Sequence, residues 1–185
     1  MTRLRRLVPP LVLLVLVAVL AAPALPRAGQ EQTPTVLVVD TVRGAFEIEI
    51  YPDDAPKSVA HVLDLVAHNF YRGLRVHWVQ PGVVQFGDPQ TRDMTKQDAW
   101  GRGGSGRSVG VAETSARRFV RGTVGLAYRS NQAPTAADSQ LFILRIANPA
   151  LDGKYAAIGR VTSGLDVVDK LEMADRIRNV TIKSR

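Results

Sequence analysis

Hydrophobic positions recur along the chain at two different spacings. In residues 35–51, Phe46, Ile48 and Ile50 alternate with glutamates, which is the spacing of a strand with one buried face. We expect two strands here, joined by a tight turn at Gly44. The glutamates are interpreted as a solvent face rather than as a paired-carboxylate site, because no other acidic group converges on them.

Residues 53–71 carry the helical spacing. Asp53 or Asp54 is expected to cap the helix, Pro56 suits its first turn, and Gly73 is expected to end it. The apolar positions at helical spacing are Val59, Val62, Leu63, Val66 and Phe70.

The last third of the chain alternates short strands with loops. We expect strands in residues 122–128, 140–146, 156–161 and 176–184, and a short amphipathic helix in residues 164–173. Many short strands with two helices, and no regular strand–helix alternation, favour an antiparallel barrel whose ends are covered by helices. The fold class is therefore mainly β, in one domain.

Residues 1–28 differ from the rest of the chain. A basic stretch is followed by a long apolar run and by the small-residue tripeptide Ala22–Ala24, which is the order of a secretory signal with its cleavage site. We predict an exported protein, periplasmic or extracellular, with residues 29–34 as a linker. The run also approaches the ~20 residues that span a bilayer, so an uncleaved anchor in the inner membrane is the alternative.

Charge and cysteine content narrow the function. The net charge of +7 falls to +4 without residues 1–24, which hold three arginines and no acidic residue. The remaining basic clusters have no aromatic platform beside them, so no nucleic-acid partner is expected. Without any cysteine, the chain has no disulfide, thiol nucleophile or thiolate metal site.

Several catalytic chemistries do not fit the motifs. His61 and His68 lie two helical turns apart and are interpreted as surface or boundary residues rather than metal ligands, and none of the three histidines accompanies a nucleophile turn. The "GRGGSG" of residues 101–106 lacks the strand before it and the helix after it that a dinucleotide site needs. No metal or cofactor is expected, and a groove lined by apolar residues with Gln85 and Gln140 suits an extended peptide.

Three segments carry a resemblance to a known family. "GAFEIEIYPDDAPKSVAHVLDLVAHNFYRGLRVHWVQPG", "VVQFGDP" and "ADSQLFILRIANPALDGKYAAIGRVTSGLDVVDKL" follow one another in register and resemble the cyclophilin pattern over about residues 35–172. The resemblance implies a cyclophilin-like domain over residues 35–185, an eight-stranded antiparallel barrel capped by two helices. It also implies peptidyl-prolyl cis-trans isomerisation without cofactor or metal.

The resemblance assigns residues to that reaction, whose C–N rotation has a barrier of ~18–20 kcal/mol. In the family an arginine donates to the amide nitrogen of the twisted bond, a contact that is stronger in the transition state than in the ground state. Phe142 and Leu151 match the wall that holds the proline ring, and Gln85 and Gln140 match the two glutamines that hold the peptide and the arginine. The substrate-binding positions are Val83, Gln85, Ala127, Tyr128, Gln140, Phe142, Leu151 and Tyr155.

The segment of residues 75–88 departs from the family pattern. His77 matches the family's histidine, but Trp78 stands at the arginine position, and one residue is missing before Gln85. An alignment anchored on Gln85 would place His77 in the arginine position instead, so both residues are catalytic candidates. Since a charged hydrogen bond contributes roughly 1.5–3 kcal/mol, loss of the arginine predicts about a ten- to hundredfold lower rate.

Three functions are compatible with this pattern. The first is an exported isomerase of reduced activity that assists folding of proline-containing clients. The second is a non-catalytic module that binds proline-containing peptides or a partner protein, with Trp78 as a stacking wall. In the third, Trp78 fills a groove that binds nothing. We expect a monomer that meets a membrane only through an uncleaved N-terminal segment.

Overall fold

The computed structural model describes residues 34–183. The predicted signal segment and all but the last residue of the predicted linker lie outside the described residues. Within residues 34–183 no helix combines the length and the apolar character that a membrane crossing requires.

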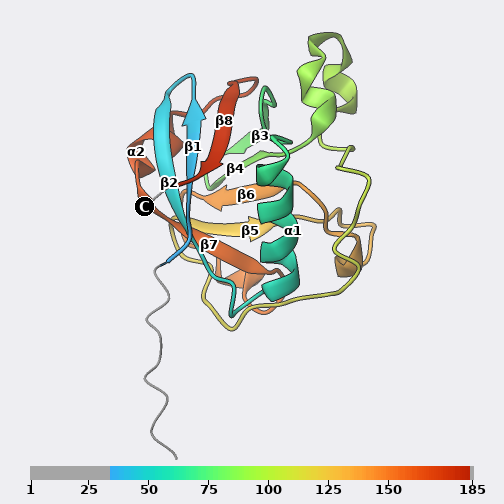
Figure 1. Ribbon diagram of the computed structural model, residues 1–185, viewed down its shortest axis with the longest axis vertical. Coiled ribbons are helices and arrows are strands. Elements are labelled where there is room, and N and C mark those ends of the chain that lie inside the picture. Colours follow the sequence, from blue (N-terminus) through green and yellow to red (C-terminus); the bar gives the residue numbers. More distant parts are fainter. Residues whose placement is uncertain (1–33, 184–185) are drawn as a thin grey trace, which may run out of the picture. The chain divides into compact units, whose positions relative to one another are not determined.

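Eight strands and two α-helices make up this unit (Figure 1). The strands are β1 (Val36–Thr41), β2 (Gly44–Ile50), β3 (Val76–Gln80), β4 (Val83–Phe86), β5 (Thr123–Leu126), β6 (Leu141–Leu144), β7 (Ala157–Ser163) and β8 (Ile177–Ile182). The helices are α1 (Pro56–Ala67) and α2 (Leu165–Lys170), with 3-10 turns η1 (Pro89–Arg92), η2 (Met94–Ala99), η3 (Pro134–Ala136) and η4 (Pro149–Leu151). The predicted strands and helices of the last third are all present.

All eight strands belong to one antiparallel sheet in the order β3-β4-β6-β5-β7-β2-β1-β8. The two edges of this sheet meet, because Val76 N–H donates to Asp175 O at 2.9 Å and Ile177 N–H donates to Leu74 O at 2.8 Å. Helix α1 packs against β8 and α2 packs against β2 (Figure 1). The predicted eight-stranded antiparallel barrel with two helices is confirmed.

Alternation along the strands explains why the sheet closes around a core. Phe46, Ile48 and Ile50 are buried, whereas the glutamates between them are not. Side chains at alternate positions of a strand point to opposite faces, so one face of β2 supplies the barrel interior. A second, smaller cluster of buried residues, Phe119, Phe142, Leu144 and Ala157, lies apart from this core.

The N-terminus of α1 is capped from a distant loop. Neither Asp53 nor Asp54 caps the helix, so that prediction is wrong; the N-cap is Ala55, without a side-chain hydrogen bond. Instead, the Glu113 carboxylate accepts from the Ser58 N–H at 2.7 Å and from the N–H of the preceding residue at 3.0 Å. These contacts lower the pKa of Glu113, although its partial burial acts in the opposite direction.

The C-terminus of α1 also differs from the prediction. The helix ends at Ala67, and Asn69 takes a left-handed backbone conformation with φ of 56° two residues later. Asparagine tolerates this conformation better than most residues, which is why the helix stops before Gly73. Gly73 belongs to the connection into β3, where its N–H donates to Ile177 O.

Candidate functional site: a peptide groove beside a second pocket

Two hollows adjoin each other on the barrel surface. The first, here called the apolar groove, has a volume of about 590 Å³, and the second, here called the side pocket, has about 790 Å³. Four residues line both of them: Trp78, Gln85, Ala127 and Tyr128. An extended ligand that crosses these four residues therefore reaches both hollows.

The structure brings the sequence-predicted site residues together around these hollows. The apolar groove is lined by Trp78, Val83, Gln85, Ala127, Tyr128, Phe142, Leu151 and Tyr155. His77 and Gln140 line the side pocket instead, together with four of the same residues. Their grouping follows from the pairing of β3, β4 and β6 and from the loops after β5 and β6. Their roles in binding and catalysis stay predictions.

Aromatic rings form the far wall of the apolar groove. The rings of Phe142 and Tyr155 meet edge to face with centroids 5.4 Å apart, and Tyr155 stacks on Tyr128 at 4.7 Å. The Phe142 ring packs closely against β5, where a side chain on Gly125 would overlap it. Glycine at this position thus lets the ring form an apolar wall, as a binding site for a proline ring requires.

A β-bulge between Val76 and Trp78 sets the orientation of the near wall. Trp78 pairs directly with Gln85 across β3 and β4, and its side chain is 53% exposed. His77 is the extra residue of the bulge and is buried, with 6% exposure. Bulges re-aim side chains at functional edges, so Trp78 and not His77 stands on the groove surface beside Gln85.

The amide of Gln140 organises the floor between the two hollows. Its Nε2 donates to the carbonyl oxygens of Gly101 at 3.0 Å and Gly103 at 2.7 Å. Its Oε1 therefore faces the other way and accepts from Gln85 Nε2 at 2.7 Å, with His77 Nε2 at 3.1 Å. A single amide orientation satisfies all four contacts, because an amide oxygen only accepts and an amide nitrogen only donates.

This network assigns the tautomer of His77. Since Gln140 Oε1 can only accept, the proton of the neutral ring belongs on Nε2. The other nitrogen, Nδ1, is buried without a hydrogen-bond partner among residues 34–183. Burial lowers the pKa of His77, while the charge of Asp88 and the Gln140 hydrogen bond oppose that shift. His77 is therefore neutral at pH 7 and donates a hydrogen bond to Gln140 Oε1.

A cationic donor is missing from the apolar groove. Its lining within the described residues includes no lysine, arginine or histidine. Arg75 lies elsewhere, with Nη1 donating to Ala174 O at 3.0 Å. Groups that could hold a metal ion, with three or more histidines, cysteines or acids, are likewise not found in residues 34–183.

The barrel and groove define a peptide-binding β-barrel, and comparison with known proteins gives its family. The family model "Cyclophilin type peptidyl-prolyl cis-trans isomerase/CLD" matches residues 36–185. The chain belongs to this family, whose activity is peptidyl-prolyl cis-trans isomerisation.

Individual relatives agree with this assignment. A "Probable peptidyl-prolyl cis-trans isomerase" of Brucella abortus is 38% identical over 165 residues, covering 87% of this chain and 83% of the relative. The "Peptidyl-prolyl cis-trans isomerase-like 1" of Aspergillus oryzae is 32% identical, covering 74% of this chain and 81% of the relative. A crystal structure of a Cryptosporidium parvum cyclophilin has a TM-score of 0.71 at 22% identity, covering 83% of this chain and 99% of that one, which shows the shared fold.

The sequence reading missed the side pocket. The "GRGGSG" segment, which the sequence excludes as a dinucleotide site, contributes to the lining of this pocket, and the carbonyl oxygens of Gly101 and Gly103 accept from Gln140. Glycine is needed at position 103 because the loop packs against Asp88 there, and an added side chain would overlap the Asp88 carboxylate. The sequence did hold a signal for a binding site here, because the aromatic Trp100 and the cationic Arg102 lie next to these glycines.

Proposed function

We propose that this protein is an exported peptidyl-prolyl isomerase of reduced rate that assists the folding of proteins outside the cytoplasm. The observation that carries the proposal is an apolar groove lined by Phe142, Leu151 and Tyr155, with Trp78 on the opposite side at the position where the resemblance expects the arginine. The basic and apolar residues 1–28 support the export part of the proposal.

The groove residues suffice for a slow isomerase. Phe142, Leu151 and Tyr155 offer apolar contact to a proline ring and remove water from it. Gln85 donates one amide hydrogen to Gln140, so its second amide hydrogen is available to a client carbonyl. Neutral hydrogen bonds contribute about 0.5–1.5 kcal/mol, compared with roughly 1.5–3 kcal/mol for charged ones. A neutral site is therefore expected to accelerate the rotation by less.

A second candidate function is a module that binds proline-containing segments without isomerising them. The exposed Trp78 indole favours it, because a large aromatic surface beside an apolar groove suits stacking on a peptide. Under this function the client would bind, but the site would stabilise the twisted amide no more than the planar one.

One pair of measurements separates these functions. Isomerisation of a short Ala-Pro peptide is followed by NMR exchange between its cis and trans signals, and binding of the same peptide is measured in parallel. We expect binding together with exchange that is faster than in buffer alone. Binding with an unchanged exchange rate would establish the non-catalytic module. If the peptide shows no binding and no acceleration, both functions are refuted.

The export part has a separate test. The full-length chain is produced in a bacterial host and cell fractions are separated, followed by mass determination of the recovered protein. We expect the protein outside the cytoplasm, with residues 1–24 removed. A full-length form in the membrane fraction would establish the anchored alternative, and full-length protein in the cytoplasm would refute export.

A further inference from the structure

The side pocket is built differently from the apolar groove. Its walls come from Trp78 and Trp100, from the backbone of residues 101–106, and from residues 127–132 after β5. Its lining is mixed, with the aromatic rings of Trp78, Trp100 and Tyr128 beside glycines and polar side chains. Charged side chains are the feature that separates it from the apolar groove, whose lining has none within the described residues.

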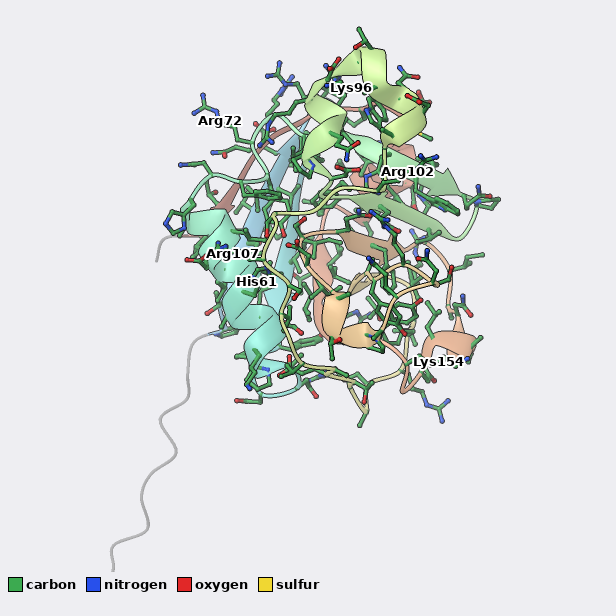
Figure 2. The ribbon with its side chains drawn as sticks, turned by 90° about the vertical axis from the view of Figure 1, so that its right-hand side faces the viewer. His61, Arg72, Lys96, Arg102, Arg107 and Lys154 are labelled. Carbon is green, nitrogen blue, oxygen red and sulfur yellow. The ribbon has the colours of Figure 1, made fainter. Side chains whose placement is uncertain are left out.

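Two guanidinium groups at this pocket are unpaired. Arg102 and Arg129 are exposed, and neither side chain makes a hydrogen bond or ion pair within residues 34–183. Two other exposed arginines do form ion pairs: Arg107 with Asp64 at 2.7 Å, and Arg121 with Asp169 at 2.6 Å. Figure 2 shows Arg102 and Arg107 at different points of the same loop, with Arg107 lying beside α1 and His61.

The acid that lines the side pocket does not neutralise these two arginines. Asp138 is 17% exposed, and its Oδ1 accepts from Ser105 Oγ while its Oδ2 accepts from Gly106 N–H at 3.1 Å. His61 Nε2 approaches the same carboxylate at 3.4 Å. These contacts hold the glycine loop against α1 and occupy the carboxylate. These neutral donors do not remove the carboxylate's charge, but the lining still holds two positive side chains, Arg102 and Arg129, against one negative side chain.

We propose that Arg102 and Arg129 are specificity-determining residues that select clients with an acidic side chain on one flank of the proline. This inference rests on the proposed function, because it places the proline in the apolar groove and the flanking residue in the side pocket. Trp78, Gln85, Ala127 and Tyr128 line both hollows, so a bound chain passes directly from one to the other. Guanidinium forks match a carboxylate geometrically, which favours glutamate or aspartate over other polar side chains.

The expected discrimination is moderate. Exposed ion pairs are weak, so two of them give roughly a fivefold preference for Glu over Gln at low salt. The preference should shrink as salt rises, because exposed charges are screened. A lysine at the same peptide position should bind worse than glutamine, because like charges repel.

The test uses peptides with Glu, Gln or Lys at one to three positions before or after the proline. Binding constants and isomerisation rates are measured for the wild-type chain and for Arg102→Gln with Arg129→Gln. We expect the Glu preference on one side of the proline only, and its loss in the double variant. Each single variant, Arg102→Gln and Arg129→Gln, is also compared with Arg72→Gln, which likewise removes one positive charge but lies outside both hollows (Figure 2).

The outcomes distinguish this inference from the proposed function. Equal binding of Glu and Gln peptides, or the same preference on both sides of the proline, would overturn the inference while leaving the isomerase intact. An equal loss in the Arg72→Gln control would also overturn it, because the effect would then be one of net charge. A Glu preference in binding without any acceleration would sustain the inference and refute the isomerase.

Discussion

The two walls of the apolar groove differ in how closely they follow the family pattern. The far wall, from β6 and the loop after it, keeps the expected residues Phe142 and Leu151 and an aromatic at Tyr155. The near wall, from β3 and β4, keeps Gln85 and pairs it with Trp78, the residue that the family resemblance sets at the arginine position. Under the proposed function, the far wall holds the proline ring and the near wall is where a charged donor would act on the amide. The proposal therefore assigns binding and catalysis to different walls of the groove.

Trp78→Arg tests the near wall and has the largest expected effect. An arginine here would stand beside Gln85, from a backbone position already paired with it. We expect kcat/KM to rise about ten- to hundredfold, because a charged donor favours the twisted amide by roughly 1.5–3 kcal/mol. Isomerisation of the Ala-Pro peptide by NMR exchange measures the change.

Trp78→Lys is the control for this substitution, since it adds the charge without the planar fork. We expect it to restore less activity than arginine. An unchanged rate with arginine would show that the groove lacks more than the donor, and would favour the non-catalytic module.

Phe142→Leu tests the far wall. Removing the ring reduces contact with the proline, and we expect kcat/KM to fall about tenfold through a higher KM. Phe119→Leu is a matched control, because Phe119 stacks on Phe142 at 5.9 Å within the same buried cluster but does not line the groove. Both changes should lower the free energy of unfolding by about 1–2 kcal/mol. Equal losses of activity in the two variants would mean that Phe142 acts through packing alone.

Periodicity predicted the barrel because its strands and helices repeat a local pattern. The alternation of Phe46, Ile48 and Ile50 and the proline at position 56 were enough to place β2 and the start of α1. The cap of α1 could not be predicted in this way, because Glu113 approaches the helix from a loop 55 residues away along the chain.

The site was predictable only in part for the same reason. The family resemblance located the motif residues that line the two hollows. It could not show the β-bulge between Val76 and Trp78, because a bulge depends on how two strands pair and not on residue spacing. The sequence predicted Trp78 at the arginine position, with His77 as the alternative if the alignment is anchored on Gln85, and the pairing of Trp78 with Gln85 favours Trp78. The side pocket joins Trp100, the glycine loop after it and the β5–β6 connection, which no local pattern brings together.

The smallest expected effect concerns His77, beneath the near wall. Burial lowers its pKa in the folded protein below the value of about 6.5 that it has in an unfolded chain. The folded state then binds fewer protons than the unfolded state just below pH 6.5, so the free energy of unfolding falls as pH decreases through that range. The contribution is fully present above pH 6.5 and is lost progressively below it.

His77→Gln isolates this contribution, since glutamine keeps a donor for Gln140 but does not titrate. Urea unfolding of both proteins between about pH 7.5 and pH 5 should give a flatter pH dependence for the variant, with His61 and His68 present in both as internal controls. The imidazole ¹⁵N signals of the wild-type should show the proton on Nε2, as the Gln140 contact requires. Parallel pH profiles, or a proton on Nδ1, would contradict the neutral His77 donor and with it the fixed orientation of Gln85 at the near wall.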